Sequence, residues 1–259
     1  MSHALASLRE TYRDPLFLRR AGGVTPTPRA NRLAVAVRQA LDLLDAAASE
    51  GGGYVPSRSE RAFRLYLTDI GETVFLPPLM AALAKEAPRV RIEAYQVDLA
   101  DLAPAIDSGR LDLALGYIPS LDVQRTVLWR ERYVVVMRRG HPLAKLRPTA
   151  SALARLEYAL VRAHPATTRA LHDLGLADRI RLSIPHFMVL PRILAETDLA
   201  VMMPPRLYAE FERMGRYAMW RPRAGMPSLD VSVHWAARFA ADPGLAWLRG
   251  RIVQLFREP

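Results

Sequence analysis

The 259-residue sequence contains no cysteine. This excludes a disulfide framework, a thiolate zinc site, an iron–sulfur cluster and a cysteine nucleophile. No run of about 18 uncharged apolar residues is present, which is the length that a membrane-spanning helix needs. The N-terminal segment is charged by Arg9, so it also lacks the apolar core of a signal peptide. We therefore expect a cytoplasmic protein that does not span a membrane.

The usual catalytic signatures are also missing. The sequence has no G-x-S-x-G, no H-E-x-x-H, no Walker loop and no G-x-G-x-x-G after a strand. No two of the six histidines have the i, i+4 spacing of a helical metal site. The sequence therefore predicts no enzyme, no metal site and no bound cofactor.

Positive charge is in excess and concentrated at one end. The net charge is +10, and the first 38 residues hold seven arginines against only Glu10 and Asp14. Such clustering favours a polyanion as partner, either nucleic acid or an anionic membrane surface. A general preference for arginine is the alternative, because all but two of the basic residues are arginine.

The N-terminal segment has the pattern of a helix followed by a hairpin. Residues 2–12 form one apolar face at helical spacing, with polar residues on the other. Asp14 and Pro15 end this helix, and residues 16–28 then read as strand, tight turn and strand. A helix followed by a basic hairpin indicates the second half of a winged helix.

A second and longer helix is expected from Arg29 to about Ser49. Its apolar residues are spaced four and three apart, which is the heptad pattern that pairs two helices. The residues of this seam are Leu33, Val37, Ala40 and Leu44. An ordinary amphipathic helix packed on its own domain is the alternative. Glycines at 51–53 and Pro56-Ser57 then indicate a linker, with a domain boundary near residue 58.

From Phe63 to Phe256, strand and helix patterns alternate. The first five elements read β-α-β-α-β, which requires a parallel sheet with right-handed crossovers. After the apolar strand at 134–137, a second set of strand candidates is separated by helical patterns. The sequence therefore predicts two small α/β units.

Two places in these units suit a ligand. The turn at 68–73 follows a strand and opens a helix, so the hydroxyls of Thr68 and Thr73 and the helix N–H groups could bind an anion. A simple N-cap is the alternative reading. Tyr117 ends the third strand of the same sheet. His164 and His186 follow strands of the second unit, and an imidazole with an aromatic neighbour suits an aromatic carboxylate.

In order and spacing, a set of motifs resembles the LysR-type transcriptional regulators, in the branch of the salicylate-responsive and nitrotoluene-responsive regulators and the nodulation regulators. The motifs are SHALASLRE, DPLFLRR, TPTPRA, TDIGETVFLPPLM, SGRLDLALGYIP, RERYVVVMRRGHPLA, IPHF and TDLAVMMP. The resemblance covers essentially the whole chain.

The resemblance implies a fold and a domain order. Residues 1–28 correspond to a partial winged helix-turn-helix, 29–57 to a linker and dimerisation helix, and 58–259 to an effector-binding domain. This last domain is expected to be α/β, with two Rossmann-like subdomains of type 2 periplasmic-binding-protein architecture. Subdomain I spans about 62–134 and 230–258, and subdomain II about 135–229. Homodimers or homotetramers on promoter DNA are implied, with a small-molecule effector.

Site residues are also implied by the resemblance. The effector cleft corresponds to Thr68, Gly71, Phe75, Tyr117, His164, His186, Met203 and Pro204. Contacts to double-stranded promoter DNA correspond to Ser2, His3, Ser7, Arg9, Arg19, Arg20 and Arg29.

In this family the segment that matches SHALASLRE is the recognition helix, preceded by roughly 30 to 40 residues that complete the helix-turn-helix. We therefore expect the true start to lie upstream of Met1. The function implied is a regulator switched by an aromatic carboxylate. Three alternatives remain open: a protein of the same fold that binds the effector but not DNA, an exported solute-binding protein, and an enzyme on the same scaffold.

Overall fold

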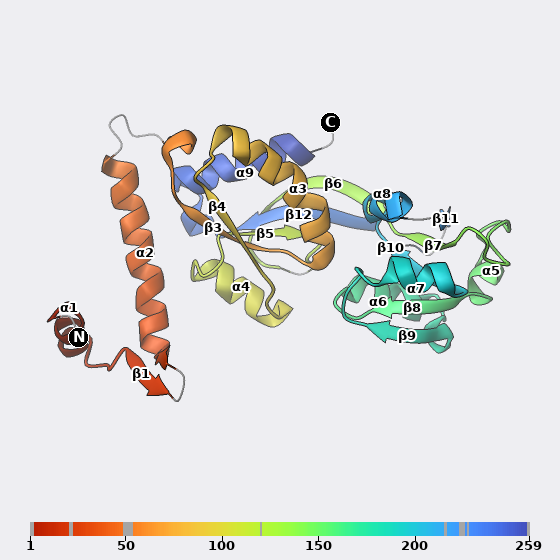
Figure 1. The fold of residues 1–259 in the computed structure, drawn as a ribbon, viewed down its shortest axis with the longest axis horizontal. Helices are drawn as coiled ribbons and strands as arrows, with labels where there is room; N and C mark the ends of the chain where they lie inside the picture. The colour runs from red at the N-terminus through yellow and green to blue at the C-terminus, as the bar shows by residue number, and fades with distance from the viewer. Residues whose placement is uncertain are drawn as a thin grey trace.

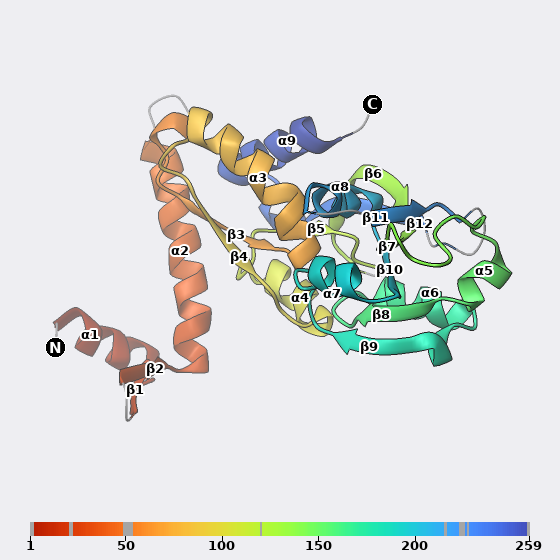
Figure 2. The same cartoon turned by 45° about the vertical axis from the view of Figure 1, so that its right-hand side comes forward.

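The computed structural model describes residues 3–20, 23–48, 54–119, 121–214, 217–222, 226 and 228–257. An N-terminal helix and hairpin lie at one end of the molecule beside a long helix, and two α/β subdomains follow (Figures 1 and 2). Within the described segments, no helix has both the length and the apolar character needed to cross a lipid bilayer.

The N-terminal elements match the predicted helix, hairpin and helix. They are α1 (His3–Tyr12), β1 (Phe17–Arg20), β2 (Gly23–Pro26) and α2 (Pro28–Ala48). Thr27 begins α2, because its hydroxyl accepts a hydrogen bond from the Ala30 N–H at 3.0 Å and Pro28 occupies the first helical position, where no N–H is needed. The same hydroxyl donates to the Asp14 carboxylate at 2.7 Å. This bond ties the start of α2 to the loop that follows α1.

Subdomain I is built on a five-stranded sheet. Its strands, in spatial order, are β4 (Arg91–Tyr95), β3 (Ala62–Tyr66), β5 (Leu113–Gly116), β12 (Ser228–Trp235) and β6 (Gln124–Arg132). The first three are parallel to one another, whereas β12 is antiparallel to both β5 and β6. Helices α3 (Asp69–Glu86) and α9 (Pro243–Phe256) share the apolar core on one face, and α4 (Leu99–Asp107) packs on the other.

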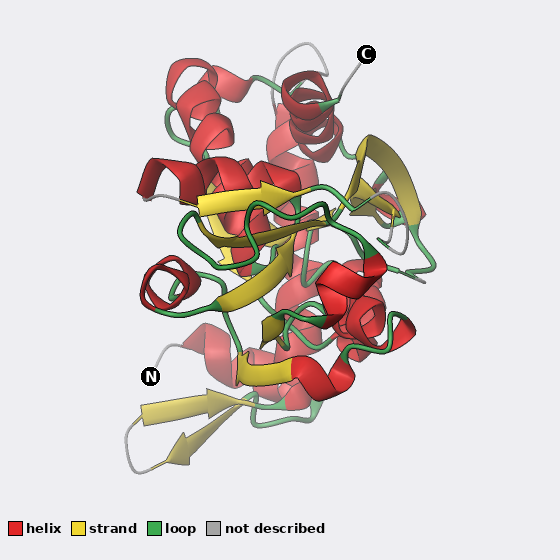
Figure 3. Cartoon of the chain, turned by 90° about the vertical axis from the view of Figure 1, so that its right-hand side faces the viewer, coloured by secondary structure: helices red, strands yellow, loops and turns green. Residues whose placement is uncertain are grey.

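Subdomain II has the same construction. Its strands, in spatial order, are β11 (Tyr217–Trp220), β7 (Val134–Arg138), β10 (Leu199–Met203), β8 (Glu157–Val161) and β9 (Ile180–Ile184). The strand β8 is parallel to β10 and β9, and β7 is antiparallel to β10 and β11. Its helices are α5 (Ala150–Ala154), α6 (Pro165–Asp173), α7 (Leu190–Glu196) and α8 (Pro205–Met214). The view along the long axis shows helices around the strands (Figure 3). The predicted pair of α/β units is confirmed.

The chain crosses between the subdomains twice. It leaves the first sheet at the end of β6, passes through Tyr133 and enters the second sheet as β7, and it returns to the first sheet as β12. The sequence did not predict β6 as a strand. Helix α3 buries Phe75, Leu79 and Leu83 in the core, whereas Met80 is 43% exposed.

Candidate functional site

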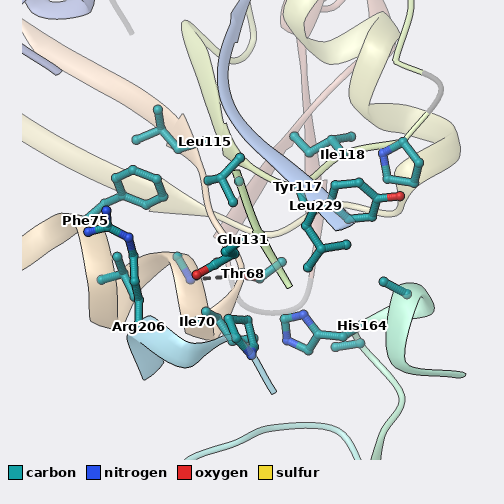
Figure 4. A pocket seen from close by; sticks show the side chains of 18 of the residues that line it. Thr68, Ile70, Phe75, Leu115, Tyr117, Ile118, Glu131, His164, Arg206 and Leu229 are labelled. Atoms are coloured by element: carbon teal, nitrogen blue, oxygen red, sulfur yellow. Dashed lines mark hydrogen bonds between the residues drawn. The ribbon is translucent and has the colours of Figure 1, made fainter. Parts of the chain in front are cut away.

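A cavity of about 70 Å³ lies between the subdomains, at the carboxyl ends of β3 and β5. Subdomain I contributes the start of α3, the segment after β5 and one face of β6. Subdomain II contributes the segment before α6 and the start of α8. Phe75 and Arg206 lie at one end of the cavity and Tyr117 at the other, with His164 beneath (Figure 4). Ligands bind outside the carboxyl ends of strands in open α/β sheets, so this is the expected position.

The wall at the Phe75 end is aromatic and carries a positive charge. The Phe75 and Trp129 rings lie 5.3 Å apart, and Phe256 meets the edge of Phe75 at 4.8 Å. The guanidinium carbon of Arg206 lies over the Trp129 ring, 4.2 Å from its centroid. Because Trp129 belongs to subdomain I and Arg206 to subdomain II, this cation–π contact also joins the two halves.

The crossover strand adds an acid and a phenol. Glu131 and Tyr133 follow Trp129 at two-residue spacing and line the cavity with it. Burial raises the pKa of the Tyr133 phenol to about 12, and the nearby Thr167 hydroxyl opposes that rise. Tyr133 therefore keeps its proton at neutral pH and is available as a hydrogen-bond donor.

Asp69 connects the two subdomains beside the cavity. It is the first residue of α3, and its Oδ1 accepts hydrogen bonds from the Ile70 N–H at 3.0 Å and from His164 Nε2 at 2.8 Å. Its Oδ2 accepts from the Phe187 N–H at 2.6 Å. Burial by itself raises the pKa of this carboxyl, but the hydrogen bonds from His164 and Phe187 bring it below its ordinary value. Asp69 is therefore ionised at neutral pH and accepts from His164.

The turn at 68–73 forms a helix cap. The Thr68 hydroxyl accepts a hydrogen bond from the Gly71 N–H at 3.3 Å. Thr73 donates to the Asp69 carbonyl at 2.9 Å, within its own helix. Thr68 lines the cavity while it caps α3, whereas Thr73 does not line it. A side chain at Gly71 would meet Leu67 at 3.1 Å, so glycine allows the helix to start close to β3.

The cavity gathers six of the eight residues expected in the effector cleft, namely Thr68, Gly71, Phe75, Tyr117, His164 and Pro204. The other two, His186 and Met203, are not part of its lining. The turn after β9 buries Phe187 against the His164 ring and leaves His186 exposed. Met203 ends β10 and is fully buried in the core of subdomain II, among side chains of α7 and α8.

Among the cavity residues that were not predicted are Trp129, Glu131, Tyr133 and Arg206. Trp129 and Glu131 share one face of β6 and Tyr133 directly follows that strand, so the alternation in LWRERY was the available signal. No local pattern identifies Arg206, because it reaches the cavity from α8 only after the second subdomain has folded.

The residues expected to contact DNA lie on α1, the hairpin and the start of α2. Ser2 and the side chain of Arg20 lie outside the described part of the chain. His3 and Ser7 are exposed on α1, Arg19 on β1 and Arg29 at the start of α2. The side chain of Arg9 donates to the Pro15 carbonyl at 2.8 Å, so it also holds the loop after α1.

The predicted seam of α2 lies on the surface of the single chain. Val37 is 47% exposed and Leu44 is 63% exposed. Ala40 is also exposed and Leu33 is half-buried. The described side chains of α2 therefore present an apolar row that this chain itself does not cover.

Comparisons with known proteins agree with this architecture. The LysR substrate binding domain matches residues 57–257. The chain is 37% identical to the HTH-type transcriptional activator NagR of Ralstonia sp, over all of this chain and 88% of NagR. It is 34% identical to the HTH-type transcriptional activator NahR of Pseudomonas putida, with the same coverage.

A solved structure gives the same result in three dimensions. A probable transcriptional regulator from Pseudomonas aeruginosa superposes with a TM-score of 0.72 at 29% identity, over 98% of this chain and 87% of that one. The two sheets and the cavity between them agree with the domain match. The chain is therefore a member of the LysR family of transcriptional regulators, with an effector-binding domain and no enzymatic role.

Proposed function

We propose that this regulator binds promoter DNA and is switched by a small aromatic carboxylate in the cavity between its subdomains. The observation that carries the proposal is the wall at Arg206: a guanidinium stacked on Trp129, beside the Phe75 ring. Aromatic rings favour a planar ring of the ligand, and a guanidinium favours its acid group.

Two further residues restrict the orientation of the ligand. His164 offers an imidazole to the same cavity, while Glu131 places a carboxylate there. Because Glu131 repels a second acid group, and His164 donates its Nε2 hydrogen to Asp69, we expect the effector carboxylate to point toward Arg206.

The size of the cavity indicates that binding requires movement. A cavity of roughly 150 Å³ admits benzene, and this one has about half that volume. We therefore expect the cavity to widen when an aromatic acid enters it, with the subdomains moving apart. An effector changes promoter activity if it binds one arrangement of the subdomains more tightly than the other.

A melting-temperature titration tests the effector. Salicylate and benzoate should raise the melting temperature of the full chain, and cyclohexanecarboxylate should raise it less because it has no aromatic ring. If none of these acids stabilises the protein at millimolar concentration, an aromatic carboxylate is the wrong class of ligand.

A second candidate is a protein that binds the effector but not DNA. It is favoured by α1, which buries none of its residues and so has little to hold it in position. A gel-shift assay with the DNA upstream of the gene separates the two candidates. DNA binding that weakens steeply as the salt concentration rises supports the first candidate, the DNA-binding regulator, since protein contacts to DNA phosphates release counterions. Absence of any shift supports the second candidate.

We also propose that the exposed seam of α2 pairs two chains, with the predicted residues Leu33, Val37, Ala40 and Leu44 at the contact. A dimer would place two basic N-terminal segments on one DNA duplex, which fits a regulator better than a solute-binding protein.

A further inference from the structure

We propose that Asp69 is a positioning residue for the effector site: its carboxylate holds the two subdomains together and fixes the orientation and tautomer of His164. The inference rests on the proposed function only where it concerns the effector. The contact between the subdomains is a separate claim that can be tested without any ligand.

The Asp69 carboxylate reaches across the boundary between the subdomains. Asp69 is the first residue of an 18-residue helix of subdomain I, yet two of its three hydrogen-bond donors belong to subdomain II. These donors are the His164 ring, which precedes α6, and the backbone N–H of Phe187, which follows β9. One carboxylate therefore joins α3 to two separate segments of the other subdomain.

The hydrogen bond between His164 and Asp69 is largely buried. The side chain of His164 is 9% exposed and that of Asp69 is 10% exposed, so water competes little for their hydrogen bond. The His164 ring is also held by Phe187, whose ring meets it edge to face at 5.0 Å. A charge-assisted bond in such surroundings is stronger than one on the surface.

The Asp69 carboxylate determines which ring nitrogen of His164 remains for a ligand. An ionised carboxylate can only accept, so the hydrogen of His164 must lie on Nε2. Nδ1 is then the nitrogen that a ligand in the cavity can use. Without the Asp69 charge the ring could rotate or change tautomer, and the cavity would present a different hydrogen-bonding group.

The variant Asp69→Asn tests the inference in the full chain. Asparagine has nearly the same shape, but one oxygen cannot serve both His164 and Phe187, and its NH₂ group would face the N–H donor of Phe187. Asp242→Asn is the matched control. Asp242 likewise lies at the start of a helix of subdomain I, where it accepts from the Leu245 N–H at 2.8 Å, and it bonds Arg61 rather than any residue of subdomain II.

Two ligand-free measurements report the contact directly. We expect hydrogen exchange at the Phe187 amide to become at least about tenfold faster in Asp69→Asn, the size of effect for one charge-assisted hydrogen bond. We also expect imidazole nitrogen spectra to show the Nε2–H form of His164 in the wild type and a mixture in the variant. Asp242→Asn should lower the free energy of unfolding, but it should change neither the exchange rate of the Phe187 amide nor the tautomer of His164.

A salicylate titration then tests the link to the effector, with a loss of affinity of about tenfold or more expected for Asp69→Asn. If salicylate does not bind the wild type, the effector class is wrong, and the two ligand-free readings still decide the role of Asp69. Unchanged Phe187 exchange and an unchanged His164 tautomer in Asp69→Asn would overturn the inference.

Discussion

His164 Nε2 of subdomain II lies 2.8 Å from Asp69 Oδ1 of subdomain I, although 95 residues separate the two in sequence. The segment after a strand of subdomain II and the start of a helix of subdomain I thus meet beside the cavity. The same few atoms join the subdomains and set the polarity of the site.

The Asp69 contact should contribute to acid stability. The pKa of its carboxyl lies below the ordinary value of 3.8 in the folded chain, so its stabilising effect is present above that value and is lost as the pH falls through the lower folded pKa. Urea unfolding between about pH 5 and about pH 2.5 should show a smaller loss of stability for Asp69→Asn than for the wild type. Other carboxyls such as Asp112 are common to both proteins, so the difference isolates Asp69. If the wild type and Asp69→Asn lose the same free energy of unfolding over this pH range, the prediction is contradicted.

His234 should make the free energy of unfolding depend on pH between about pH 4 and about pH 6.5. It is 1% exposed on β12, and burial, with repulsion from Arg125, lowers its pKa to about 4. Between about pH 6.5 and about pH 4 the unfolded chain therefore takes up a proton that the folded chain does not, and stability falls by on the order of 3 kcal/mol as the pH decreases. His234→Leu should remove most of this slope. The exposed His172→Leu should keep it, and equal slopes in all three proteins would show that His234 is not the cause.

Arg206 should provide much of the affinity for an acid. We expect Arg206→Gln to weaken salicylate binding by about 10-fold to 100-fold in calorimetry, because a hydrogen bond to a charged group contributes about 1.5 to 3 kcal/mol. Arg213→Gln on the same helix is the control, since Arg213 is exposed and pairs with Glu210. Equal affinities of Arg206→Gln and the wild type would place the acid group elsewhere.

The seam of α2 should determine the oligomeric state. A charge at Leu44 would have to be buried in the paired helices, so Leu44→Glu should lower the mass measured by light scattering toward that of one chain. Asn31→Glu, an exposed change at the start of the same helix, should leave the mass unchanged. A wild type that is already monomeric at micromolar concentration would refute the pairing.

Local sequence pattern predicted the alternation of strands and helices and placed Thr68, Tyr117 and His164 near a ligand site, for physical reasons visible in particular residues. Thr68 is polar, follows an apolar strand and precedes a helix, so its place at a sheet edge follows from local pattern alone. The strand β6 was missed because it lies at the edge of its sheet. Its outward residues Arg130 and Arg132 are charged, and they obscured the inward row that begins at Trp129.

The contacts between subdomains could not be predicted from local pattern. Asp69 resembles any helix-capping residue until subdomain II brings His164 and Phe187 to it. His186 was preferred over Phe187 because a histidine suggests chemistry, but the functional feature of that turn is a backbone N–H, which every residue except proline has.

A co-crystal structure with salicylate is the most direct test of the proposed site. We predict that the ring lies beside Phe75 and Trp129, with its carboxylate within hydrogen-bonding distance of Arg206, in a cavity larger than the present one of about 70 Å³. Salicylate bound instead in the outer groove near Arg125 and Arg130, with the central cavity unchanged, would contradict it.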